Sequence, residues 1–136
     1  MAVGLLALPA VALAGKIQTE GQITGDSATK VKVRVIKRSG DVIKVRGFRA
    51  KGVLSKCGPA DQPNRIDFRI RGAIPVGAEN RFDQLFKNKD GSRLRVSGKV
   101  RRHGRMVVGD LKARNFDNDD GQNCVTPKQR FKTHKV

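Results

Sequence analysis

The sequence predicts an all-β domain, a seven- to eight-stranded antiparallel sandwich or flattened barrel with one disulfide. Apolar and charged residues alternate along much of the chain, as in strands with one buried and one solvated face. Glycine-containing pairs separate these segments, as expected of β-hairpins. Two cysteines, Cys57 and Cys124, supply the disulfide, and 136 residues suit a single hydrophobic core.

The alternation sets the predicted strands. In the clearest segment, three valines alternate with Lys30, Lys32 and Arg34, and similar patterns cover 64–71 and 93–102. No segment after Gly15 has a convincing helical periodicity, although 81–87 admits one or two helical turns. The predicted strands are 16–24, 29–38, 41–53, 64–71, 81–88, 93–102, 105–115 and 128–134.

The hairpin turns are predicted at pairs that end in glycine. These pairs are Ser39-Gly40, Asp90-Gly91 and His103-Gly104. Asp-Gly is the strongest signal, because both residues tolerate the positive φ of a two-residue type I′ turn. Within 41–53 the alternation changes phase at Gly47, which predicts a β-bulge that places Val45 and Phe48 on the same, buried side.

The first residues predict export. Residues 1–14 are apolar and end in the small-x-small pattern of a signal-peptide cleavage site, so we expect residues 15–136 to form the mature domain. One feature departs from a typical signal peptide, because no Lys or Arg precedes the apolar run. A start codon assigned too late would explain this absence, and so would an ordinary buried helix in place of a signal peptide. In an oxidising compartment Cys57 and Cys124 would pair. We expect the protein to be secreted or held in the cell envelope.

Several short motifs follow one another along the chain. The motifs are Gly25-Asp26-Ser27, Phe48-x-Ala50, Cys57, Val96-Ser97-Gly98-Lys99-Val100, Asn115-Phe116-Asp117, Cys124-x-Thr126 and Phe131. Their order resembles that of a loose group of short, secreted, cysteine-paired β-sandwich proteins of high-GC Gram-positive bacteria, most of them uncharacterised. The resemblance implies the fold and the export, and it implies no activity. The chain departs from the group near its end, where Pro127 and Phe131 stand in place of glycine and an aromatic that is often tryptophan.

The residue types needed for catalysis or tight metal binding are scarce. The histidines, His103 and His134, are separated in sequence, the cysteines pair with each other, and no nucleophile, zinc or nucleotide motif is present. We therefore expect no enzyme, no cofactor and no metal. The segment 117–121 is rich in carboxylates, but it departs from the EF-hand pattern. An ordinary loop is favoured there, and weak calcium binding is left open.

The charge is the main functional signal. Lys and Arg outnumber Asp and Glu by 29 to 12, for a formal charge of +17, which attracts polyanions. Six Phe and no Trp or Tyr make an aromatic sugar-binding platform improbable. If the cationic strands share one face, it would bind an anionic backbone with little sequence preference. The candidate residues are Lys30, Lys32, Arg34, Arg93, Arg95, Lys99 and Arg101.

Three functions follow as hypotheses. The first is a non-enzymatic domain that associates with an anionic polysaccharide, teichoic acid or a lipid surface, and with nucleic acid only non-specifically. The second is a structural or protein-interaction module whose charge serves only solubility. The third is a small-ligand carrier, which would need an unfilled barrel interior. No transmembrane segment is expected in the mature chain.

Overall fold

The computed structural model describes residues 14–136, and the fold is all-β with antiparallel pairing throughout. Nearly all of the predicted signal segment, residues 1–13, lies outside the described residues. The strands are β1 (Ala14–Ile23), β2 (Asp26–Arg38), β3 (Asp41–Cys57), β4 (Gln62–Arg69), β5 (Ile74–Pro75), β6 (Arg81–Lys87), β7 (Arg93–Arg101), β8 (Met106–Asp117) and β9 (Asn123–Lys135).

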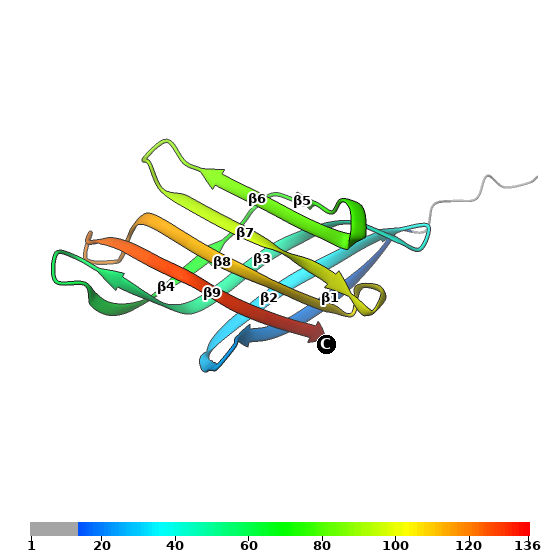
Figure 1. Ribbon diagram of the computed structural model, residues 1–136, viewed down its shortest axis with the longest axis horizontal. Coiled ribbons are helices and arrows are strands. Elements are labelled where there is room, and N and C mark those ends of the chain that lie inside the picture. Colours follow the sequence, from blue (N-terminus) through cyan, green and yellow to red (C-terminus); the bar gives the residue numbers. More distant parts are fainter. Residues whose placement is uncertain (1–13) are drawn as a thin grey trace, which may run out of the picture.

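The strands form one sheet that curls on itself. Its order is β4-β3-β2-β1-β9-β8-β7-β6, with β5 paired to β3. The end of β3 also pairs with the start of β9, so β1, β2, β3 and β9 close a small ring. Strands β6 to β9 cross in front of β1, β2 and β3, which gives a front and a back layer (Figure 1). The predicted all-β fold is confirmed, and its form is a flattened barrel.

All eight predicted strands are present, and the two-residue β5 is the one the sequence did not predict. All three predicted hairpins are present, but only the first has a two-residue turn. Arg38 pairs directly with Asp41, and the intervening Ser39 and Gly40 have φ values of 51° and 84°. The segment 81–87 is a strand.

The other two hairpins have longer loops than predicted. At Asp90-Gly91 the ladder ends at the Lys87–Arg93 pair, because the Asp90 carboxylate accepts hydrogen bonds from the backbone nitrogen and hydroxyl of Ser92 (2.9 and 2.7 Å). At His103 the chain forms a short 3-10 turn, Arg102–Gly104, between Arg101 and Met106. In this second loop the backbone nitrogen of Arg105 donates a hydrogen bond to the carbonyl oxygen of Arg102 (3.2 Å), so local hydrogen bonds favour the wider turn in both loops.

The bulge predicted at Gly47 is confirmed. Gly47 has a φ of 61°, and the register of β3 against β2 shifts there. As a result Val45 and Phe48 both lie in the core, at 1% and 2% exposure, although they are three residues apart. An extra residue on one strand restores the buried face after the change of phase.

Paired glycines make room for the aromatic core. Gly98 of β7 lies opposite Gly109 of β8, and a Cβ on either would come within 2.8 Å of a phenylalanine ring, Phe82 and Phe131 respectively. Phe131 is fully buried and its ring centroid is 5.5 Å from that of Phe48. These rings occupy the interior that a carried ligand would need.

The disulfide closes the ring of strands. Cys57 and Cys124 are bonded, lie directly opposite each other on β3 and β9, and have Cα atoms 4.1 Å apart. Beside them, the buried hydroxyls of Ser55 and Thr126 share a hydrogen bond of 2.6 Å across the same seam. The predicted disulfide is therefore confirmed, at the point where β3 joins β9.

Replacing both cysteines with alanine tests the contribution of this seam. The bond links residues 67 apart in sequence, so on the chain-entropy model its loss should lower the free energy of unfolding by about 4 kcal/mol. Urea denaturation of the oxidised protein and the double variant measures the difference. A decrease below about 1 kcal/mol would show that the strand pairing holds the seam without the covalent bond.

Gly109→Ala tests the close packing around Gly109. The added methyl would overlap the backbone carbonyl oxygen of Ser97 and the Phe131 ring, so we expect a loss of about 1–3 kcal/mol in the free energy of unfolding. The control is Gly72→Ala, since a Cβ at Gly72 meets nothing within 4 Å. Thermal denaturation of the three proteins measures both effects, and equal stability of the two variants would contradict the assignment.

Candidate anion-binding surfaces

The seven predicted cationic residues divide between two surfaces. Lys30, Lys32 and Arg34 lie on β2, and the other four lie on β7. The two strands belong to one sheet, but β1, β9 and β8 separate them. Because the sheet curls, β2 lies in the back layer and β7 in the front layer (Figure 1). The seven residues do not form one continuous face.

The front face carries more cations than the four on β7 that were predicted to bind polyanions. The outward positions of β6, β7, β8 and β9 carry Arg81, Lys87, Arg93, Arg95, Lys99, Arg101, Lys112, Arg114, Lys128, Arg130 and Lys132. The described residues of these four strands include three carboxylates, Asp83, Asp110 and Asp117 at the end of β8. Of these, Asp83 and Asp110 line the hollows described next. The alternation in 128–134 could have indicated that Lys128, Arg130 and Lys132 point outward. No pattern in the sequence indicates the order of the strands, which places these cations beside those of β7.

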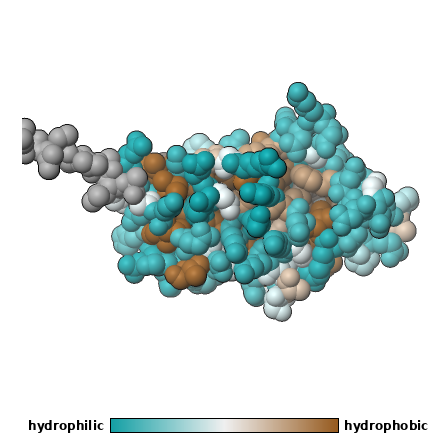
Figure 2. All heavy atoms as spheres, turned by 180° about the vertical axis from the view of Figure 1, so that it is seen from behind, coloured by the Kyte–Doolittle hydropathy of each residue, from teal (hydrophilic) through white to brown (hydrophobic). Residues whose placement is uncertain are grey.

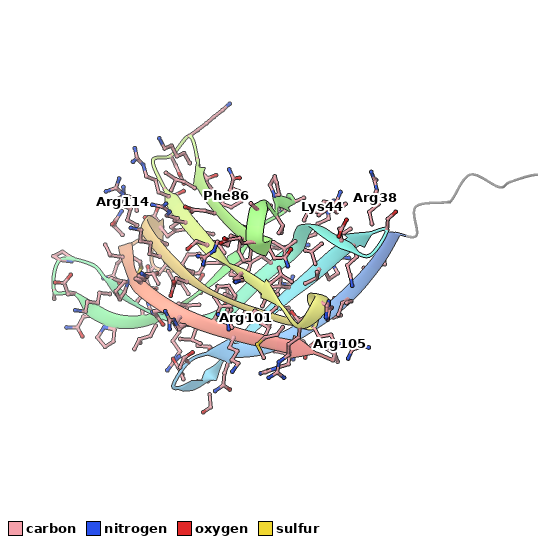
Figure 3. All side chains as sticks on the ribbon, turned by 45° about the vertical axis from the view of Figure 1, so that its right-hand side comes forward. Arg38, Lys44, Phe86, Arg101, Arg105 and Arg114 are labelled. Atoms are coloured by element: carbon pink, nitrogen blue, oxygen red, sulfur yellow. A yellow bond between two sulfur atoms is a disulfide. The ribbon has the colours of Figure 1, made fainter. Side chains whose placement is uncertain are left out.

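Three hollows connect along this front face. Their volumes are about 400, 220 and 810 Å³. The first and second share Arg95, Lys112 and Lys128, and the second and third share Ser97 and Asp110. Together they form a trough, called the front trough below, with Arg114 lining one end and Arg101 the other (Figure 3).

Four of the cations that line the front trough take part in ion pairs, and one of them, Arg81, pairs with Glu79 at 3.2 Å. Asp83 forms a two-pronged ion pair with Arg95, at 2.6 and 2.9 Å, and Asp110 lies 3.6 Å from Arg130 and 4.0 Å from Lys128. Several others have no ion-pair partner among residues 14–136. They are Arg93, Lys99, Arg101, Lys112, Arg114 and Lys132.

Like charges also face each other across the front ladders. Directly opposed cations are destabilising, by up to about 1 kcal/mol for each pair. The opposed pairs are Arg81 with Lys99, Lys87 with Arg93, Arg93 with Arg114, and Arg95 with Lys112. An anion lying in the trough would relieve this repulsion.

The hydrogen bonds from Arg95 hold the pKa of the Asp83 carboxyl below its ordinary value, and the charges of Arg95 and Lys112 act in the same direction. The same contact raises the pKa of Arg95. Asp83 therefore stays ionised at neutral pH and remains paired with one guanidinium of the trough, that of Arg95.

The back layer carries a second cationic surface. Cations oppose each other here too, in the pairs Lys30 with Lys51, Lys32 with Arg49, Arg34 with Arg46, and Arg49 with Arg69. Glu20 lies 3.4 Å from Lys32, and Asp26 pairs with Arg65 at 2.9 Å. Seen from behind, the molecule is mainly hydrophilic, with hydrophobic patches between the charged side chains (Figure 2).

The remaining candidates are the two histidines and the acidic loop at 117–121. His103, in the β7–β8 loop, and His134, whose ladder partner is Met106, are exposed at the same end of the fold, although the sequence separates them. In the acidic loop, the Asn118 side chain accepts hydrogen bonds from the backbone of Asp120 and Gln122, which makes it a self-contained turn. Within the described residues, no three His, Cys, Asp or Glu side chains are placed to hold a metal ion.

Comparison with protein-family models, curated proteins and solved structures found no match to this chain. Among residues 14–136, no helix has the length and apolar character needed to cross a membrane.

Asp83→Asn tests the acid dependence of the Arg95 pair. Since the folded pKa of Asp83 is depressed, the stabilisation is present above the ordinary pKa of 3.8 and is lost as the pH falls through the lower folded value. Both side chains are about half exposed, so we expect a loss of at most about 1 kcal/mol at pH 7 and a smaller loss in acid below pH 3.8. Urea denaturation under both conditions, with Asp119→Asn as the control, measures this. A difference that is independent of pH would contradict the ion-pair explanation.

Proposed function

We propose that this protein is a non-enzymatic domain of the cell envelope or the secreted fraction, and that it binds a linear anionic polymer along the front trough. The observation that carries the proposal is the lining of the trough, where cations from four adjacent strands surround two carboxylates. The partner we propose is a phosphate- or carboxylate-bearing wall polymer, such as teichoic acid or an acidic polysaccharide.

The dimensions of the strands suit an extended polymer. Outward side chains recur every second residue, or about 6.7 Å along a strand, and the nine residues of β7 extend for about 30 Å. Cations at that interval can follow a charged backbone, and binding would release its counterions. A row of connected hollows suits a thread-like chain better than a planar bilayer.

The choice of an envelope partner rests on export. A disulfide such as Cys57–Cys124 is typical of oxidising compartments outside the cytosol, and the predicted signal segment agrees with it. Binding to nucleic acid would then be a non-specific consequence of the +17 charge.

A second candidate function is protein interaction. Leu85 and Val125 are 42% and 49% exposed, and both line one end of the front trough. An apolar contact beside cations suits an acidic protein partner. This candidate predicts that Leu85→Ser reduces binding to that partner more than a charge change does.

The test of polymer binding is a salt titration of the oxidised protein against teichoic acid, a heparin-like polymer, anionic vesicles and duplex DNA. We expect the tightest binding to a wall polymer, with affinity that falls linearly on a log–log plot as salt rises. Arg93→Gln with Arg114→Gln should lower the affinity by about tenfold or more and reduce the slope by about two.

The matched control removes the same charge elsewhere. Arg38 and Arg71 are exposed and lie outside the trough, so Arg38→Gln with Arg71→Gln should change the affinity by less than about threefold. Equal losses in the two double variants, or equally weak binding to every polymer at physiological salt, would reduce the charge to a solubility feature.

A further inference from the structure

The bulge at Gly47 carries a smaller cationic hollow on the back layer. Its volume is about 240 Å³, and its cations come from three neighbouring strands, β2, β3 and β4. The lining residues are Gln18, Lys32, Arg34, Gly47, Phe48, Arg49 and Arg69. It shares no residue with the front trough.

The backbone of the bulge places one guanidinium. A Cβ on Gly47 would lie 2.9 Å from both Nε and Nη2 of Arg34, so the Arg34 side chain lies over the bare backbone of this glycine. Gly47 also has a φ of 61°, which favours glycine over any residue with a side chain. The adjacent Phe48 is buried in the core and is also one of the residues that line the hollow.

Arg49 lies between two other cations. Its ladder partner on β2 is Lys32 and its partner on β4 is Arg69. Arg49 is only partly exposed, so water screens these repulsions less than on an open surface. Within residues 14–136, Arg34, Arg49 and Arg69 have no ion-pair partner, whereas Lys32 has Glu20.

We propose that this hollow binds one tetrahedral oxyanion, a phosphate or sulfate group. Guanidinium groups bind such oxyanions through paired N–H donors, and three of them meet here without a carboxylate of their own. A bound oxyanion would offset the repulsion around Arg49. The site is independent of polymer binding in the front trough, because it lies on the other layer.

The test is isothermal titration of the oxidised chain with inorganic phosphate, at constant ionic strength in chloride. Arg49→Gln should lower the phosphate affinity by about tenfold or more. Arg105→Gln, which removes the same charge from the β7–β8 loop, should change it by less than about twofold. Equal losses in both variants, or phosphate binding no tighter than that of chloride, would overturn the proposal.

A thermal measurement separates binding from folding. Phosphate should raise the melting temperature of the wild type and of Arg105→Gln, but not that of Arg49→Gln. Gly47→Ala, which displaces Arg34, should weaken binding in the same way. A phosphate-induced shift of equal size in Arg49→Gln would overturn the assignment even if Gly47→Ala failed to fold.

Two further arms identify the source of the oxyanion. Binding of glycerol phosphate as tight as that of inorganic phosphate would assign the site to phosphate esters, whereas binding of inorganic phosphate alone would assign it to the free anion. The variant Arg93→Gln with Arg114→Gln should keep its phosphate affinity. If this double variant bound phosphate normally but no longer bound the polymer, the two sites would be separate. If Arg49→Gln no longer bound phosphate but still bound the polymer, the sites would likewise be separate.

Discussion

The structure depends on β3 pairing with several other strands along its length. In seventeen residues β3 pairs with β2, β4, the short β5 and, at its end, β9. A straight strand could not reach all of them, and β3 bends at Gly47 and Gly52, both with positive φ and both beside a register shift. The final contact with β9 closes the ring, and the disulfide holds it there.

Closure of the ring of strands determines which way the basic side chains point. Each strand has one face towards a core filled by valines and phenylalanines, so the cations of every strand must point outward. With 29 basic residues on 136, many cations become neighbours across the ladders. The fold tolerates this repulsion because the buried apolar surface outweighs it. Salt or bound anions would lower its cost, which links the stability of the fold to its ionic surroundings.

Much of the fold could be predicted from the sequence, because its information is local. Alternation gave the eight main strands, the change of phase at Gly47 gave the bulge, and the cysteine pair gave the disulfide. The loops at 88–92 and 102–105 were harder, since they depend on hydrogen bonds such as Asp90 to Ser92. The two-residue β5 carries too few residues for a periodic signal.

The candidate surfaces were predicted only in part. Alternation showed that Arg34 and Arg95 would be exposed, but it could not show that their strands lie in different layers. That depends on the curl of the sheet, which no single segment encodes. The position of Arg49 between Lys32 and Arg69 depends on the register of two ladders, one of which shifts at the bulge. Contacts of this kind became visible only with the structure.

The pairing of β1 with β9 has a consequence for the order of assembly. Thr19 and Thr133 share a buried hydrogen bond although 114 residues separate them in sequence. A chain leaving a ribosome or a translocation pore must therefore hold β1 with an unpaired edge until β9 follows. Such non-local contacts make folding slow, and they keep the chain open until its late segments arrive. The barrel therefore cannot be completed until the C-terminal strand β9 has left the ribosome or the pore.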